Sequence, residues 1–158
     1  MIHDLMTQNA RSDPEADAIT STSLFDSLLP LLQTAVGDRP LHCEIDELSL
    51  PSHSSEAIVL LVNELVSNSL KHGAGAIEIL LRMQPSMPPE QERRKSPRIR
   101  LEVRDEGAGF PLDFDWRKAA HTGLELIDSI GRWDLGGVVS YENQEEGGAC
   151  VVTFPYKR

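Results

Sequence analysis

A helix-like stretch in the middle of the chain, LVNELVSNSLKHG at residues 61–73, carries polar side chains along one side. At about 100° per residue, Glu64, Asn68 and Lys71 fall within roughly 60° of one another on the helical wheel, and His72 lies beside them. The opposite side has the spacing that packs against a sheet or another helix, with Ile58, Leu61, Val62, Leu65 and Ser69. One face is therefore predicted to hold the fold, and the other either to do chemistry or simply to face water.

A second group of residues that could do chemistry follows in DEGAGF, residues 105–110. Asp105 is predicted to end a buried strand, and Gly107, Gly109 and Phe110 follow it. A carboxylate at this position can accept a hydrogen bond from an exocyclic amine, and the two glycines let the backbone approach a flat ligand closely. The signal is weak alone, because an Asp-Gly pair is more often a turn.

A third group lies in HTGLELI, residues 121–127, which places Thr122, Gly123 and Leu124 at the start of a predicted helix. Free amides at a helix N-terminus attract phosphate. A glycine at a helix start is nevertheless more often a cap. The order of the three groups along the chain, rather than any one of them, carries the functional prediction.

The elements that must position these groups are a mixture of helices and strands. Hydrophobic spacing predicts helices at about 23–36, 54–72 and 122–133, and strands at 41–46, 76–83, 98–104, 136–143 and 149–154. Gly73 is expected to end the long helix. A long, solvated loop is expected between the second and third strands. This order predicts an α+β fold, a two-layer sandwich in which helices cover one face of a mixed, mostly antiparallel sheet.

Length and charge limit the classes of protein to which the chain can belong. With 158 residues and 40% hydrophobic content, it can build one domain with a core. Its 15 basic and 25 acidic residues give a net charge of -10, which argues against nucleic acid as a partner. No apolar run approaches the roughly 18 residues of a membrane span, so we expect a cytoplasmic protein without membrane contact.

Two further expectations concern the chain ends and the cysteines. Residues 1–22 have no periodicity and are predicted to be a flexible N-terminal tail, followed by one domain at 23–158. Cys43 and Cys150 show no metal-ligand spacing and are predicted to be small core residues without a chemical role.

Taken in order, the three groups resemble a known ATPase fold. Glu-x-x-x-Asn on a long helix, Asp-x-Gly-x-Gly after a strand and Thr-Gly-Leu opening a helix are typical of the Bergerat-type fold. Sensor histidine kinases, gyrase-type topoisomerases, heat-shock chaperones and mismatch-repair ATPases share this fold. The resemblance covers about residues 23–156. Within the superfamily the chain is most similar to the catalytic and ATP-binding domain of sensor histidine kinases whose helix reads like Asn-Glu-Leu-x-x-Asn-x-x-Lys-His and whose ATP lid is short.

The resemblance implies a reaction and its partners. ATP and Mg²⁺ would bind, and the γ-phosphate would be transferred to a histidine on a dimerisation domain that we expect to lie outside this chain. The partners would be this phosphoacceptor domain and a response regulator, as in a two-component system. Phosphoryl transfer of this kind needs positioning and charge neutralisation rather than covalent catalysis by the protein. The chain alone is therefore expected to be inactive as a kinase.

The resemblance also implies roles for individual residues. Glu64 matches the acidic residue that orients or activates the attacking group, and Asn68 matches the asparagine that binds Mg²⁺ and ATP. Asp105 matches the carboxylate that reads adenine. The further ATP contacts that it implies are Lys71, His72, Thr122, Gly123 and Leu124 near the phosphates, Gly107 and Gly109 near the base, and Phe110 at the start of the lid. The stretch 110–121 matches the lid.

The chain departs from the family pattern at several positions. His121 and Glu125 stand where the lid commonly ends in glycines, which predicts a weaker grip on the nucleotide. Gly148 stands where a threonine near the base is common. Nothing before residue 23 resembles the paired helices that present a phosphoacceptor histidine, and His3 is predicted to be incidental. Two other functions therefore stay open: a serine kinase of the anti-sigma-factor type, and a degenerate module that binds nucleotide or a partner without transferring phosphate.

Overall fold

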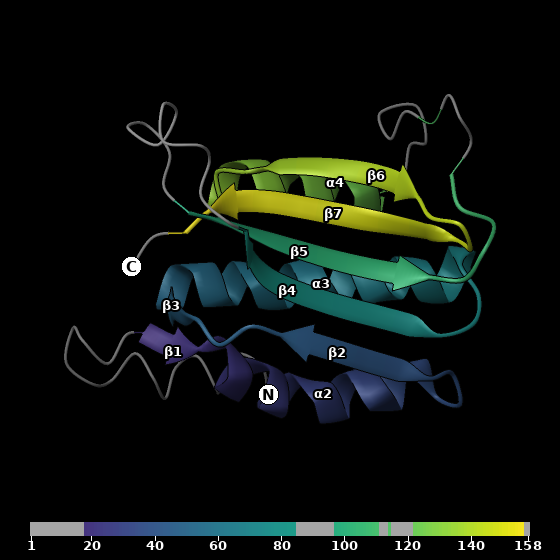
Figure 1. Cartoon of the computed structure of the whole chain (residues 1–158), viewed down its shortest axis with the longest axis horizontal. Helices are drawn as coiled ribbons and strands as arrows, with labels where there is room; N and C mark the ends of the chain where they lie inside the picture. The colour runs from purple at the N-terminus through teal and green to yellow at the C-terminus, as the bar shows by residue number, and fades with distance from the viewer. Residues whose placement is uncertain (1–17, 85–96, 111–113, 115–121, 157–158) are drawn as a thin grey trace.

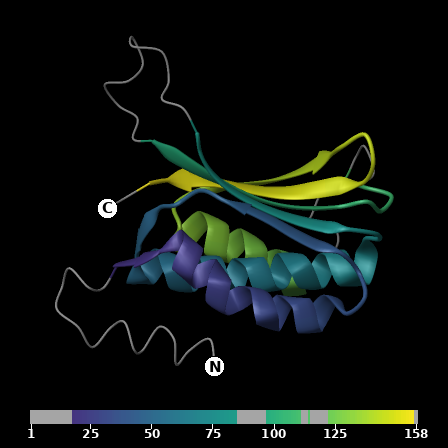
Figure 2. The same cartoon turned by 60° about the horizontal axis from the view of Figure 1, so that its bottom comes forward.

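The computed structural model describes residues 18–84, 97–110, 114 and 122–156, which form a layer of helices against a five-stranded sheet (Figures 1 and 2). Within the part of the chain that is described, no helix is long and apolar enough to cross a membrane. The elements in chain order are β1 (Ala18–Thr20), α2 (Ser21–Val36), β2 (Leu41–Ile45), β3 (Ser49–Pro51), α3 (Ser52–His72), β4 (Ile77–Gln84), β5 (Arg98–Asp105), α4 (Thr122–Ser129), the π-helical turn η4 (Ile130–Asp134), β6 (Val138–Asn143) and β7 (Gly148–Pro155).

The main sheet has the strand order β2-β4-β5-β7-β6. β2 runs parallel to β4, and every other neighbouring pair is antiparallel. The register places Asp105, Gly148 and Asn143 in one row across β5, β7 and β6. Cys150 and Tyr141 lie two residues along in the same two strands and pair with each other. This mixed, mostly antiparallel sheet with its helices on one face confirms the predicted fold class (Figure 2).

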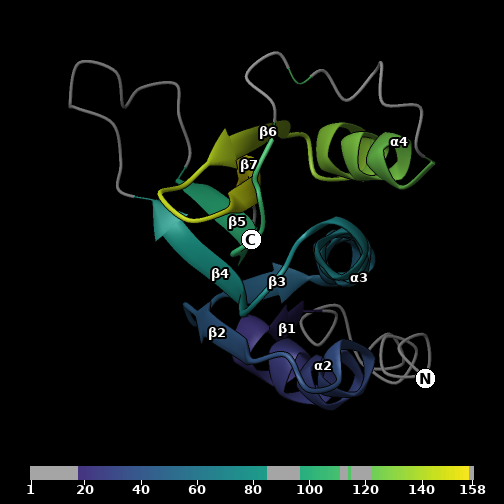
Figure 3. The same ribbon diagram turned by 90° about the vertical axis from the view of Figure 1, so that its right-hand side faces the viewer.

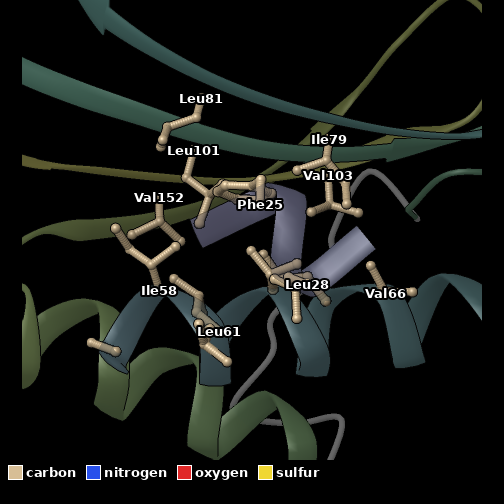
Figure 4. Close-up of a cluster of buried hydrophobic side chains, with 14 of the residues drawn as sticks. Phe25, Leu28, Ile58, Leu61, Val66, Ile79, Leu81, Leu101, Val103 and Val152 are labelled. Atoms are coloured by element: carbon tan, nitrogen blue, oxygen red, sulfur yellow. The ribbon is translucent and has the colours of Figure 1, made fainter. Parts of the chain in front are cut away.

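The helix layer has α3 in the middle, between α2 and α4 (Figure 3). α3 forms because its apolar residues recur at helical spacing, and the predicted apolar stripe is buried throughout: Ile58, Leu61 and Val62 are fully covered, and Leu65 and Ser69 nearly so. Side chains of the helices meet those of the inner strands in one continuous core (Figure 4). Each such buried side chain contributes about 1.5–3 kcal/mol of hydrophobic stabilisation. Gly73 ends the helix as predicted, and its N–H donates to the Ser69 carbonyl at 2.9 Å.

The opposite face of the sheet carries charged side chains instead of helices. Glu102 is almost fully buried there and accepts hydrogen bonds from Arg104 and from Arg100, the latter at 2.9 Å. Burial alone would raise the pKa of Glu102, but the two guanidinium groups hold it below its usual value. Arg100 also reaches Glu142 on β6 at 3.1 Å. These ion pairs balance the charge of Glu102 on a face that none of the described helices covers (Figure 2).

Two elements were missed by the sequence analysis. β1 and β3 pair with each other, and burial of Ile19 and Leu50 anchors them to the core. Each has three residues, which is too short for a visible alternation. The predicted tail of 1–22 was therefore wrong for residues 18–22, which belong to β1 and α2; residues 1–17 lie outside the described part. The predicted loop between β4 and β5 also falls largely outside it, at 85–96.

Candidate functional site

A cavity of about 760 Å³ lies where α3, the end of β5 and the start of α4 meet. It collects residues that are far apart in the sequence. Of the predicted site residues, those that line it are Glu64, Asn68, Lys71, His72, Asp105, Gly109, Phe110, Gly123 and Leu124. The other two predicted residues lie next to this lining: Gly107 donates a hydrogen bond to Asp105, and Thr122 is the first residue of α4, directly before Gly123. The predicted lid falls at 111–113 and 115–121 outside the described residues.

Asp105 lies at the end of β5, where the chain leaves the sheet. The backbone N–H of Gly107 donates to its Oδ1 at 2.8 Å, which fixes the orientation of the carboxylate. Gly73 lies directly against the same carboxylate, because a Cβ added there would be 2.4 Å from Oδ2. Among the described residues nothing donates a hydrogen bond to Oδ2, and Asp105 lines the cavity. An ionised carboxylate can only accept, so it suits an amino group rather than a carbonyl.

The loop that joins α3 to β4 is held in place from both sides. Arg39 donates from Nε to the Gly75 carbonyl at 2.7 Å and from Nη1 to the Ser69 carbonyl at 3.0 Å, so its positive charge lies at the C-terminus of α3. On the other side, Glu106 accepts from the backbone N–H of Ala76 at 2.7 Å. Neither residue was predicted from the sequence. Their role depends on contacts across the fold, and no local pattern marks Arg39.

The end of the cavity nearest α4 brings together a carboxylate, an amide and a helix N-terminus. A Cβ added to Gly123 would lie 3.4 Å from Glu64 Oε2 and 3.5 Å from Asn68 Oδ1. The first turn of α4 therefore lies against the polar face of α3, at a distance where a Cβ would make ordinary van der Waals contact. Lys71 and His72 are exposed on the last turn of α3, on the same side. Free amides at the start of α4 and the Lys71 ammonium group at this end suit an anion.

The end of the cavity nearest Asp105 is lined by aromatic rings. Phe110, Phe114 and Tyr141 contact one another, with ring centroids 5.0–5.3 Å apart. Asn143 holds the backbone of Phe110, because its Oδ1 accepts from the Phe110 N–H at 2.7 Å and its Nδ2 donates to the Phe110 carbonyl at 2.9 Å. Of these residues only Phe110 was predicted. The alternation of the strand that contains Tyr141 would have placed this ring on the inner face, beside the core.

Two groups with altered pKa values lie at this aromatic end. Burial raises the pKa of the Tyr141 hydroxyl and of the Cys150 thiol beside it, so both stay neutral. Cys150 is buried in the core, as predicted, but it also lines the cavity. Cys43 packs against the same core from β2, and burial raises its pKa to about 11. Both thiols are free.

This combination of fold and cavity agrees with comparison to known proteins. The sequence model of one protein family, the histidine kinase-, DNA gyrase B- and HSP90-like ATPases, matches residues 53–158. The chain belongs to this family of ATPases. Its matched region includes the three groups of residues that line the cavity, whereas α2 and β2 precede it.

Curated relatives within the ATPase family are longer than this chain. The sensor histidine kinase PdtaS of Mycobacterium tuberculosis (strain ATCC 25618 / H37Rv) is 23% identical over 159 residues, which covers 96% of this chain and 29% of PdtaS. PdtaS of Mycolicibacterium smegmatis is 21% identical over 155 residues, with 96% and 29% covered. The chain therefore spans less than a third of the length of these relatives.

Solved structures of the family share the fold. A blue-light activated histidine kinase, EL346 of Erythrobacter litoralis, superposes with a TM-score of 0.69 at 21% identity, covering 98% of this chain and 51% of that one. The ATP-binding domain of PrrB from Mycobacterium tuberculosis gives a TM-score of 0.69 at 18% identity, covering 90% of this chain and 99% of that domain. The second comparison shows that one ATP-binding domain accounts for nearly all of the described fold.

Proposed function

We propose that this chain is the ATP-binding catalytic domain of a cytoplasmic two-component sensor histidine kinase. It binds ATP with Mg²⁺ and transfers the γ-phosphate to a histidine on a dimerisation domain, from which a response regulator takes it. The observation that carries the proposal is the arrangement of the cavity: an amine-accepting carboxylate at one end, and Glu64, Asn68 and the first turn of α4 at the other. The names of the PdtaS relatives support the same reaction.

The base of ATP would lie at the Asp105 end. Its exocyclic amine donates to the carboxylate, whose geometry Gly107 and Gly73 restrict. Gly109 and Phe110 border the same region. A hydrogen bond to a charged acceptor contributes about 1.5–3 kcal/mol, which is enough to prefer adenine over a base with a carbonyl at that position.

The triphosphate would lie at the α4 end. The free amides that follow Thr122 and Gly123 attract the phosphate oxygens, and Leu124 covers this side of the cavity. Lys71 and His72 donate to the phosphates from the end of α3. Glu64 stands beside the phosphates, where it orients the attacking histidine or accepts its proton.

Mg²⁺ fits the chemistry of the residues present. Asn68 offers a neutral amide oxygen at the phosphate end, and Mg²⁺ prefers oxygen ligands in an octahedral shell completed by phosphate and water. No cluster of three or more acidic, histidine or cysteine side chains in the described ranges could hold a metal alone. Asn68 would therefore hold the ion together with the nucleotide. When bound, Mg²⁺ neutralises charge on the phosphates.

The proposal is tested by transfer of labelled phosphate from ATP. The chain alone should stay essentially unlabelled, and adding the dimerisation domain of a candidate partner kinase should place the label on that domain. A phosphoramidate on histidine is lost in acid because its nitrogen leaving group becomes protonated, and it survives base; a serine phosphoester behaves in the opposite way. The matched variant Glu64→Gln should retain ATP affinity and lose most of the transfer rate.

Three results would contradict the proposal in different ways. Acid-stable label on the partner would favour the serine kinase of the anti-sigma-factor type. Strong label on the chain by itself would show that a phosphoacceptor was missed in residues 1–22. Nucleotide binding without label on any candidate partner would favour a binding module that transfers no phosphate.

A further inference from the structure

We propose that Arg39 and Glu106 are positioning residues of the nucleotide site, and we call this pair the loop clamp. They hold the loop at 73–76, which in turn fixes the carboxylate of Asp105. The inference rests on the proposed function, because Asp105 is the proposed contact to ATP. Neither member of the clamp is among the described residues that line the cavity. Both therefore act through the loop rather than by touching the nucleotide.

Arg39 holds the loop from the side of the helix layer. It belongs to the turn that follows α2, the helix beside α3 (Figure 3). Its Nε donates to the Gly75 carbonyl at 2.7 Å and its Nη1 to the Ser69 carbonyl at 3.0 Å. The Ser69 carbonyl also accepts from the Gly73 N–H at 2.9 Å. One planar, charged group thus joins the last turn of α3 to the loop that leaves it, at the end of the helix that favours a cation.

Glu106 holds the same loop from the side of the sheet, directly after Asp105 at the end of β5. Its Oε1 accepts from the Ala76 N–H at 2.7 Å, and its own N–H donates to the Ala74 carbonyl at 2.8 Å. Gly75 lies between these two contacts with φ of +71°, and a Cβ added there would overlap Glu106 Oε1. The path of the loop therefore depends on both the glycine and the carboxylate.

The loop transmits this hold to Asp105 by direct packing. A Cβ added to Gly73 would overlap the Asp105 carboxylate, and one added to Gly107 would lie 2.9 Å from the Gly73 Cα and 3.0 Å from the Ala74 nitrogen. The start of the loop and residues 105–107 are thus in contact without space for a methyl group. Because no flexible side chain lies between them, a shift of the loop has to move the carboxylate or the Gly107 N–H that binds it.

The loop clamp differs in kind from the ion pairs on the open face of the sheet. There, Arg82 and Glu44 are exposed side chains that bind each other. Arg39 and Glu106 instead bind backbone groups of one loop from opposite sides. The Nη2 of Arg39 is buried without a partner among the described residues, so the guanidinium group is enclosed at this position. Contacts to the backbone fix the path of the chain, which is what a positioning role requires.

Substitutions that remove one side of the clamp test the inference. Binding of a non-hydrolysable ATP analogue with Mg²⁺ would be measured by titration calorimetry on the full chain. Arg39→Met keeps apolar volume and removes both hydrogen bonds, and Glu106→Ala removes the acceptor. Each should weaken binding about five- to tenfold, because a displaced carboxylate keeps part of a hydrogen bond whose full loss costs about ten- to 150-fold. Glu106→Gln keeps an acceptor oxygen and should recover most of the affinity.

Two matched controls remove the same kinds of side chain elsewhere. Arg82→Met and Glu44→Ala change the net charge in the same way as the clamp variants, but both residues are exposed and lie outside the cavity lining. They should leave the affinity for the analogue unchanged. A loss in the clamp variants alone would therefore come from the loop and not from the altered charge of the chain.

The amide signal of Gly107 separates positioning from a role in stability alone. This N–H donates to Asp105 Oδ1 at 2.8 Å, so its proton chemical shift reports the place of the carboxylate. In the ¹⁵N-labelled chain without nucleotide, the Gly107 signal should move in Arg39→Met and stay in place in Arg82→Met. Arg39→Met is the informative variant for this measurement, because Glu106 adjoins Gly107 in the sequence.

The outcomes distinguish this inference from the function on which it rests. A lower melting temperature with unchanged affinity in Arg39→Met and Glu106→Ala would overturn the inference and leave the proposed function standing. Weaker binding by Arg39→Met with an unchanged Gly107 signal would overturn the route through Asp105. Failure of the unmodified chain to bind the analogue would overturn the proposed function, and the Gly107 signal would still show whether Arg39 positions the carboxylate. Thermal melts establish that each variant is folded; if Arg39→Met is not, the two variants of the exposed Glu106 decide.

Discussion

One methyl group at Gly73 tests how tightly the fold constrains Asp105. Gly73 has φ of -101° and ψ of -168°, an extended conformation that alanine adopts without strain. The added Cβ would lie 2.3–2.5 Å from all three carboxylate atoms of Asp105, far inside the normal contact distance of about 3.5 Å. Gly73→Ala should therefore displace the carboxylate by about 1 Å while the helix that precedes it stays intact.

The expected loss follows from the bond that the carboxylate is proposed to make. A hydrogen bond to a charged acceptor contributes about 1.5–3 kcal/mol. At about 1.4 kcal/mol per factor of ten, Gly73→Ala should weaken binding of an ATP analogue by about ten- to 150-fold. Because the displaced carboxylate and a deleted one lose the same contact, Gly73→Ala should add little to the loss caused by Asp105→Ala.

The measurement is titration calorimetry with a non-hydrolysable ATP analogue, accompanied by thermal unfolding. Gly37→Ala is the matched control, since Gly37 has φ of +64° and open space around its Cβ position. With ψ of -122° this conformation is sparsely populated by any residue except glycine, so the methyl should cost about 1–3 kcal/mol and lower the melting temperature while the affinity is unchanged. If Gly73→Ala bound the analogue like the unmodified chain, the close packing of Gly73 on Asp105 would have no functional consequence and the reasoning would be wrong.

Three further predictions concern the metal, a buried hydroxyl and alkaline pH. Asn68→Ala should weaken ATP binding more with Mg²⁺ than with EDTA, and equal losses by calorimetry under both conditions would mean that Asn68 only supports the helix. Tyr141→Phe removes a buried hydroxyl that lies beside the Cys150 thiol, a weak hydrogen-bond partner, so in urea unfolding it should cost little. Tyr156→Phe loses a 2.8 Å hydrogen bond to a carbonyl and should cost about 1 kcal/mol, and the reverse order would contradict the burial argument. Unfolded thiols ionise above about pH 8.5, whereas burial keeps Cys43 and Cys150 protonated in the folded protein. The free energy of unfolding should therefore fall by about 1.4 kcal/mol per pH unit for each thiol, and for Cys43 this fall should end near pH 11. A free energy of unfolding that stays constant in urea melts at pH 8, 9 and 10 would refute this.

The sequence was most informative where one element carries two patterns. On α3, the apolar spacing predicted which side is buried, and the polar residues left on the other side, Glu64 and Asn68, were brought to the cavity. The glycine-rich stretches could be placed because they adjoin clear helices and strands. Local periodicity was therefore enough to predict the two layers of the fold and the polar face of α3, whereas the roles of the site residues came from the family resemblance and stay predictions.

Residues that act through distant contacts could not be found in this way. Arg39 reaches the end of α3 from a turn 30 residues earlier, and Asn143 holds Phe110 from 33 residues later, yet neither lies in a recognisable motif. The fit between Gly148 and the Phe110 ring likewise depends on the packing of two strands. Such partners follow from the register of the sheet, which single-sequence patterns leave open.

The central claim is that the cavity binds ATP and that Asp105 reads its base. Titration of Mg²⁺-ATP into the unmodified chain and into Asp105→Ala, with melting temperatures recorded for both, tests this most directly. We predict saturable binding of one ATP by the unmodified chain, and a loss of about ten- to 150-fold in a variant that remains folded. Absence of binding by the unmodified chain, or equal affinity in the folded Asp105→Ala variant, would contradict the claim.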